Sequence, residues 1–325
     1  MRKAVVLLIA ITLFVRPVIS QEREKPLVVT SLPPVASIIK EALGDSVEVV
    51  YLVPPGVEPH QYQLSPEQIA LLKNADVIVT TGHLPAENKI IELKSEGSIE
   101  GIVLEPKDYS EYGFKYLPER WYEGKNNPHG TWLDPMNALA IAKATAVALS
   151  QLYPEKDQEF SKAFERFEEK VTTIIKAYSS IAKDKKAIIE LPSQQYALEW
   201  LGIEVISSIK PEAEGPAKSI DELSTLRPDI IVYDENTPDV LKNAAYELSN
   251  RLGVPLANIT VLWTDKNYTE VLIQNSKSVI GALKEEKKVV VKEGNEKVQY
   301  IAISLLTGLI VGVSIGVVIR KCPVF

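Results

Sequence analysis

The sequence predicts an α/β protein of two lobes, each with a mainly parallel sheet, joined by one long rigid helix. Short apolar runs alternate with helical segments in both halves of the chain, which is typical of strand–helix–strand units. Between the halves, one segment of about 29 residues keeps a helical apolar period without glycine or proline. The chain is long enough for two domains of ordinary size.

In the first lobe, the strands are expected at residues 27–30, 47–53 and 77–81, and the helices at 34–43 and 66–74. Gly44 is placed to end the first helix. Ser65 is a typical N-cap of the second helix, with Pro66 at its first position and Gln68 three residues after the cap. This capping box fixes where the chain leaves the preceding strand.

The joining helix is expected at residues 155–183. Its apolar side chains recur at spacings of three and four residues: Phe160, Phe164, Phe167, Val171, Ile174, Tyr178 and Ile181. At 1.5 Å per residue it would extend about 44 Å, enough to brace both lobes and limit hinge motion.

In the second lobe, strands are expected at residues 186–191, 205–206, 229–233 and 259–263, and helices at 220–226 and 238–252, with Gly253 as a stop. The domain boundaries follow: residues 21–154 form the first lobe, 184–290 the second lobe, and 291–300 a stalk.

The chain ends predict export and membrane attachment. Residues 1–20 have the layout of a secretory signal peptide. Residues 301–319 carry no charge and can span a membrane as a helix, with Arg320 and Lys321 in a cytoplasmic tail of residues 320–325. The competing interpretation is a buried core helix, which this terminal, unbroken, glycine-containing segment does not favour. We therefore expect a single-pass protein of the cell membrane whose body faces outward.

Charge and cysteine content narrow the function classes. The chain has 36 basic and 43 acidic residues, and removing the five basic residues of the two end segments leaves 31 against 43. This balance argues against nucleic acid and is compatible with a cationic solute. The only cysteine, Cys322, lies beyond the predicted span. An exported body without cysteine has neither a disulfide nor a thiolate metal site, so metal ligands must be His, Asp, Glu or water.

Two of the three histidines lie in rigid turns. His60 follows an apolar strand in a turn framed by proline and glycine, and His129 lies in the segment Asn-Pro-His-Gly just before a helix. Two histidines held in this way indicate metal capture rather than packing.

The sequence resembles the solute-binding proteins of metal-transporting ABC importers, the zinc and manganese group. The resemblance covers nearly the whole exported body and rests on five segments: Val-Thr-Ser-Leu-Pro-Pro-Val-Ala from Val29, Leu-Val-Pro-Pro-Gly-Val-Glu-Pro-His ending at His60, Ala-Asp-Val-Ile-Val-Thr-Thr-Gly from Ala75, Trp-Leu-Asp-Pro from Trp132, and the spacing from Tyr268 to Asn275. It implies two α/β lobes joined by a rigid helix, with a metal in the cleft that is passed to a membrane permease.

The resemblance implies that His60 and His129 are the first two metal ligands. The family's third histidine is replaced by Leu191. Glu190 is one residue out of register, and neighbouring strand residues point to opposite faces, so it is a ligand only if the strand has ended or bulged there. His83 offers another replacement, because it lies just past the strand at residues 77–81, on the side where crevices form in open α/β sheets.

The family's final carboxylate falls on Asp265, although the loop after it is shorter than in relatives. Glu235, at the end of the strand at residues 229–233, is a competing carboxylate. Imidazoles with a carboxylate suit zinc and can also hold manganese or iron. Residues 92–127 contain no histidine, so the histidine-rich loop of many zinc-specific relatives is missing.

We therefore expect a divalent metal, zinc or manganese, to be captured outside the cell and delivered to an ABC permease, without enzymatic activity. The main alternative keeps the fold but assigns it a metal chelate or another solute. A zinc-dependent hydrolase is a third possibility, which no paired motif such as HExxH supports.

Overall fold

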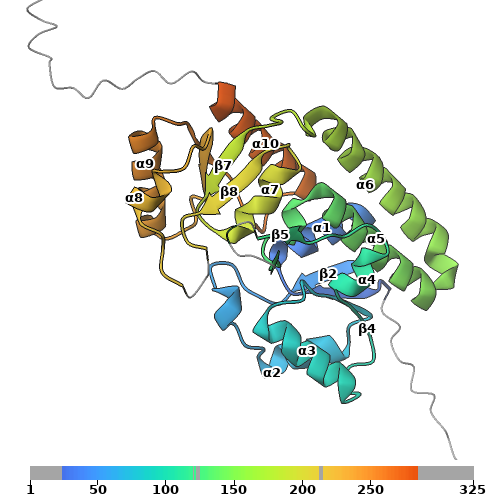
Figure 1. Ribbon diagram of the computed structural model, residues 1–325. Coiled ribbons are helices and arrows are strands. Elements are labelled where there is room, and N and C mark those ends of the chain that lie inside the picture. Colours follow the sequence, from blue (N-terminus) through green and yellow to red (C-terminus); the bar gives the residue numbers. More distant parts are fainter. Residues whose placement is uncertain (1–23, 120, 122–124, 212–214, 285–325) are drawn as a thin grey trace, which may run out of the picture.

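The structure is a computed structural model that describes residues 24–119, 121, 125–211 and 215–284 (Figure 1). The predicted signal peptide, stalk, membrane span and cytoplasmic tail lie outside the described residues. Within the described ranges, every helix is too short or too polar to cross a membrane.

The N-terminal sheet has four parallel strands in the order β2-β1-β3-β4. They are β1 (Leu27–Thr30), β2 (Glu48–Tyr51), β3 (Val77–Val79) and β4 (Ile102–Leu104). Because neighbouring residues of β1 face opposite sides, Val28 packs with α1 (Pro33–Leu43) and α5 (Pro135–Leu152), whereas Val29 packs with α2 (Pro66–Lys73) and α3 (Pro85–Ser95). The sheet is parallel, as predicted, and helices cover both of its faces.

Local chemistry fixes the ends of these helices. Gly44 follows α1 with φ +57°, and Ser65 and Gln68 form the predicted capping box at the start of α2. After β4 come α4 (Pro106–Ser110) and a short antiparallel hairpin of β5 (Leu117–Pro118) and β6 (Asn126–Asn127).

The C-terminal sheet is also parallel, in the order β10-β9-β7-β8. Its strands are β7 (Lys186–Ile189), β8 (Glu204–Ser208), β9 (Ile230–Tyr233) and β10 (Leu256–Asn258), and its helices are α7 (Gln195–Glu199), α8 (Ile220–Leu223), α9 (Asp239–Leu252) and α10 (Tyr268–Lys284). Gly253 ends α9 with φ +71°, as predicted. Figure 1 shows α8 and α9 at one end of the molecule and α2 and α3 at another.

The prediction of a strand at residues 259–263 is wrong. The strand in this region is β10. The N–H of Ile259 still donates to the carbonyl oxygen of Tyr233, but the following two bond to side chains: Thr260 donates to Asn275 Oδ1 and Val261 donates to Asp234 Oδ2. The predicted helix at residues 220–226 is also too long. It ends at Leu223, because the N–H groups of Thr225 and Leu226 bond to carbonyl oxygens three residues back instead of four, which turns the chain out of the α-helix.

The long helix between the halves is α6 (Asp157–Tyr178), which has 22 residues. It is shorter than the predicted helix of residues 155–183, because a 3-10 turn precedes it and Ser180 and Asp184 adopt positive φ after it. Helix α6 packs against α1 and α5 and also contacts α10.

One apolar core extends between the two sheets. It joins the inner face of the N-terminal sheet, including Val28, to the inner face of the C-terminal sheet, including Val232, through α1, α5, α6 and α10. Two smaller cores lie on the outer faces, under α2 and α3 and under α8 and α9. The continuous inner core holds the two halves together beneath the site.

Candidate metal site

His60 lies in the loop after β2, in a 3-10 turn (Pro59–Gln61). The side chain of Glu58 caps this turn by accepting a hydrogen bond from the backbone N–H of His60 at 3.2 Å. At the far end of the loop, Gln68 donates to the carbonyl oxygen of Leu52 at 2.6 Å, which ties the start of α2 to the end of the strand. The loop is therefore anchored at both ends.

His83 lies in the loop after β3, where a buried carboxylate organises the backbone. Glu87 is 2% exposed and accepts hydrogen bonds from the N–H of His83 at 2.9 Å and from that of Leu84 at 3.0 Å. The hydroxyl of Thr81 lies 2.9 Å from Glu87 Oε1 and 3.2 Å from His83 Nδ1. The Glu87 carboxylate thus fixes both the backbone of this loop and the Thr81 hydroxyl beside the imidazole of His83.

His129 lies between β6 and a 3-10 turn (Thr131–Leu133) that leads into α5. Asn127 Oδ1 accepts from the backbone N–H of His129 at 2.9 Å and lies 3.2 Å from His129 Nδ1. The Asn127 amide is buried and donates to the carbonyl oxygen of Pro192 at 2.8 Å and to Gln195 Oε1 at 2.9 Å. A fully hydrogen-bonded amide therefore orients this imidazole.

The structure brings all three histidines of the chain together. The ring centroids are 5.4 Å apart for His60 and His83, 5.3 Å for His60 and His129, and 4.9 Å for His83 and His129. One nitrogen from each ring can be chosen so that all lie within 4.8 Å of one another. Three imidazoles from three loops thus converge on one point, as expected of metal ligands.

Burial keeps two of these imidazoles neutral. Loss of solvent lowers the pKa of His83 to about 4, and repulsion from His60 adds to this effect, while a hydrogen bond with Thr81 opposes it. Loss of solvent also lowers the pKa of His129 to about 3, with repulsion from His83 and His60. At neutral pH both rings carry a lone pair that a metal can accept.

Hydrogen bonds select which nitrogen carries that lone pair. The carbonyl oxygen of Pro192 can only accept, so Nδ2 of Asn127 faces it and Oδ1 faces His129. The Nδ1 atom of His129 must then carry the proton. The hydroxyl of Thr81 donates to the carboxylate of Glu87, so Nδ1–H of His83 donates to that hydroxyl. In both rings Nε2 is the free ligand atom, the arrangement usual in metal-ligating histidines.

The predicted carboxylates do not join this group. Asp265 is exposed, accepts from the Thr264 hydroxyl at 3.0 Å and is not among the residues lining the cavity beside the histidines. Glu235 is exposed and is not among them either. Their roles as ligands stay predictions without support from this geometry.

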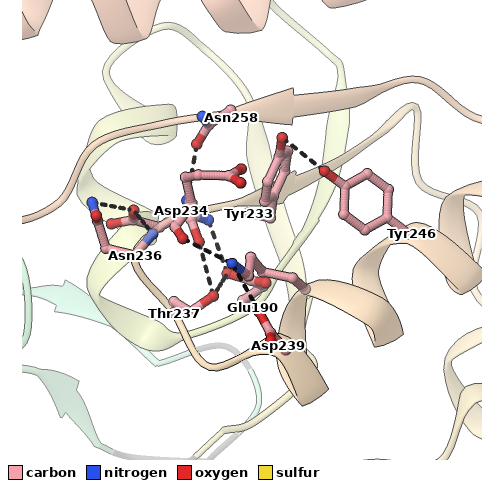
Figure 2. Close-up of polar contacts among 10 residues, drawn as sticks. Glu190, Tyr233, Asp234, Asn236, Thr237, Asp239, Tyr246 and Asn258 are labelled. Atoms are coloured by element: carbon pink, nitrogen blue, oxygen red, sulfur yellow. Dashed lines mark hydrogen bonds and ion pairs between the residues drawn. The ribbon is translucent and has the colours of Figure 1, made fainter.

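Glu190 is fully buried directly after β7, behind the cavity wall. Its Oε2 atom accepts from the N–H of Asp234 at 2.9 Å and from the hydroxyl of Thr237 at 3.0 Å (Figure 2). Burial raises the pKa of this carboxyl to about 6, while the two hydrogen bonds oppose the shift. Glu190 therefore holds the loop after β9 in place, and it does not stand with the histidines in the ligand group.

A cavity of about 320 Å³ opens beside the histidines and lies between the two halves. The N-terminal half contributes the three histidines, Glu58 and apolar residues such as Trp132. The C-terminal half contributes Lys210, Asp234 and the residues near them. The site therefore has room for more than a metal ion.

The supporting residues Asn127, Thr81 and Glu87 were not predicted from the sequence. A local signal exists for two of them, since Asn127 and Thr81 each lie two residues before a candidate histidine, and Asn and Thr side chains often bond to groups two residues ahead. Nothing in the sequence alone shows that Glu87, on the following helix, turns back to Thr81.

Comparisons with known proteins identify the family of the chain. A family model described as ZnuA, zinc-uptake complex component A periplasmic, matches residues 28–282. The zinc-binding lipoprotein AdcA of Streptococcus pneumoniae is 28% identical over 280 residues, which are 78% of this chain and 54% of AdcA. The manganese ABC transporter substrate-binding lipoprotein PsaA of Streptococcus mitis is 28% identical over 204 residues, 58% of this chain and 64% of PsaA. This chain thus spans about half of the length of AdcA.

Among solved structures, the solute-binding protein FpvC of Pseudomonas aeruginosa in complex with Mn²⁺ has a TM-score of 0.65 and 21% sequence identity. The match covers 80% of this chain and 98% of FpvC. At this identity the likeness concerns the fold, and it agrees with the two parallel sheets described above.

Proposed function

The chain belongs to the family of the periplasmic zinc-uptake complex component A, and from this premise we propose that it captures a divalent transition metal outside the cell and delivers it to an ABC permease. The metal is zinc or manganese, the two ions named for its curated relatives. The protein is a carrier rather than an enzyme, and its chemistry is the exchange of water for protein ligands.

The observation that carries this proposal is the group of His60, His83 and His129, whose ring nitrogens can approach one point. His83 takes the place of the histidine that the family usually supplies from the second lobe, where this chain has Leu191. Neutral imidazoles suit zinc, and an added oxygen ligand makes the set suitable for manganese as well.

The test is a competitive binding titration of the full chain with zinc and with manganese. The variants His60→Ala, His83→Ala and His129→Ala are compared with Asp265→Asn and Glu235→Gln. We expect one equivalent of metal in the wild type, a loss of affinity of at least about tenfold in each histidine variant, and no change in the two carboxylate variants. Full affinity in His83→Ala together with a loss in Asp265→Asn would replace this ligand set by the one that the family resemblance implies.

The proposal includes membrane attachment through residues 301–319, with residues 1–20 as the export signal and 320–325 in the cytoplasm. Its support is the uncharged segment followed by Arg320 and Lys321, and the naming of the streptococcal relatives as lipoproteins gives membrane attachment a precedent. A chain that ends at residue 297 should appear in the soluble extracytoplasmic fraction, whereas the full chain should remain with the membranes. Release of both would overturn the anchor.

A further inference from the structure

The ligand group lacks a negative charge. Among the described residues, no aspartate or glutamate joins His60, His83 and His129 within ligand distance. A divalent ion held by three imidazole ligands keeps its full charge of two in a partly buried site. The two carboxylates that line the cavity are not in the ligand group, and both accept hydrogen bonds from backbone N–H groups: Glu58 from His60, and Asp234 from Asn236 and Val261. Because a buried charge without a directly bound counter-charge is costly, the fourth ligand is best supplied by an anion. Carboxylate oxygen is a common ligand of both zinc and manganese.

The cavity is too large for the ion alone. A water molecule occupies about 30 Å³ in the liquid, so about 320 Å³ would hold many waters beside the metal. Pockets for small organic molecules begin at about 300 Å³. The space therefore fits a small organic ligand bound next to the ion.

Hydrogen bonds already connect the two halves of the molecule on the side of His129. Tyr196 donates to the carbonyl oxygen of Asn127 at 2.6 Å, and Trp132 Nε1 donates to that of Val261 at 3.0 Å. Gly130 lies so close to the backbone of Ser193 that an added Cβ would overlap its oxygen. The His129 loop is thus already in contact with the other half, and the cavity beside it keeps its volume with these contacts in place.

The wall of the cavity opposite the histidines contains Lys210 and the loop with Asp234. Lys210 lines the cavity from the C-terminal half, and within the described part of the chain its side chain forms no salt bridge. Its backbone is held by hydrogen bonds with Glu190 and Ser208. Asp234, also in this wall, accepts hydrogen bonds from the N–H group of Asn236 (Figure 2) and from that of Val261. Lys210 is therefore the charged group of this wall that is available to an anion.

We propose that the protein binds its metal as a ternary complex with a small di- or tricarboxylate. One carboxylate completes the coordination of the metal held by the three histidines, and a second carboxylate pairs with Lys210 across the cavity. This inference rests on the proposed metal capture and specifies the form in which the metal is carried.

Native mass spectrometry of the full chain tests it. The chain is mixed with zinc alone, with each of acetate, L-malate and citrate alone, and with zinc plus each carboxylate. We expect an adduct of one zinc and one malate or citrate, and little acetate adduct, because acetate has no second carboxylate. Lys210→Met should reduce the ternary adduct at least tenfold and keep the zinc adduct, whereas Lys176→Met, on the exposed face of α6, should change neither.

The outcomes separate the two claims. Zinc adducts without carboxylate in every mixture would overturn the ternary complex and leave metal capture standing. No zinc adduct in any mixture would overturn the proposed function itself. A ternary adduct that Lys210→Met leaves intact, or that forms equally with acetate, would overturn the pairing with Lys210.

Discussion

The side-chain amide of Asn127 donates a hydrogen bond of 2.8 Å to the carbonyl oxygen of Pro192, and this contact joins the two halves of the molecule. It also fixes which end of the amide faces His129, since a carbonyl oxygen can only accept. One buried side chain thus couples the contact between the halves to the tautomer of a proposed metal ligand.

Substitutions at Asn127 should separate these two roles. Asn127→Asp keeps an oxygen that accepts from His129 Nδ1 but loses the donor to Pro192, so we expect a lower free energy of unfolding, by about 1–3 kcal/mol, with zinc affinity retained. Asn127→Ala loses both contacts and should also weaken zinc binding, by about 10–100-fold. Urea denaturation and zinc titration measure the two effects. Equal zinc affinity in both variants would contradict a role for the amide in orienting the imidazole.

The hydroxyl of Thr81 should act on zinc binding through His83. Thr81→Val keeps the shape of the side chain but removes the hydroxyl between Glu87 and His83 Nδ1, so the proton on that nitrogen loses its acceptor. We expect zinc affinity to fall by about 10–100-fold. Thr81→Ser is the matched control, because it restores the hydroxyl and should restore the affinity. If the Thr81→Ser and Thr81→Val variants bind zinc with equal affinity, the hydroxyl does not orient His83.

The close approach at Gly130 predicts a large loss of stability. Gly130 has φ +76°, and an added Cβ would lie 1.9 Å from the oxygen of Ser193. Gly97 has a similar φ of +72° with nothing within 4 Å of an added Cβ. Gly97→Ala should therefore cost about 1 kcal/mol or slightly more from backbone strain alone, and Gly130→Ala considerably more. Similar free energies of unfolding for the two variants would show that the halves do not touch at this point.

Ionisation of the buried Glu190 carboxyl should lower the free energy of unfolding at neutral pH. Its pKa of about 6 in the folded protein exceeds the ordinary value of 4.5, so the folded state disfavours the ionised form. The free energy of unfolding should therefore decrease as the pH rises from about 4.5 to 6. Glu190→Gln removes this titration, and its stability relative to wild type should improve by about 2 kcal/mol between pH 4.5 and pH 7.

The same variant tests whether Glu190 is a ligand. Urea denaturation at the two pH values gives the stability, and a zinc titration at pH 7 gives the affinity, which should not change. A loss of zinc affinity in Glu190→Gln would make Glu190 a ligand after all.

Much of the fold could be predicted from the sequence, because its signals are local. The Ser65 and Gln68 capping box and the stops at Gly44 and Gly253 depend on residues a few positions apart, and the structure has all of them. The predicted strand at residues 259–263 is wrong for the opposite reason. Its apolar alternation is the same whether its N–H groups bond to a strand or to the distant side chains of Asp234 and Asn275.

The candidate site, like the fold, was predictable where its signals are local and not where it depends on distant contacts. Positions after strands marked His60 and His83 as candidates, and a rigid turn marked His129. Whether the three rings meet depends on contacts far apart in the sequence, such as that of Asn127 with Pro192. The exposure of Asp265 and the burial of Glu190 follow from how the second sheet and its loops pack, which no local pattern encodes.

The most direct test of the ligand set is a crystal structure of the full chain with zinc, in which the anomalous signal at the zinc edge locates the metal. We predict zinc within about 2.0–2.1 Å of Nε2 of His83 and His129 and of one ring nitrogen of His60, with an oxygen that is not from the protein in the fourth position. A zinc ion bound to Asp265 or Glu190, with His83 turned away from it, would contradict the account.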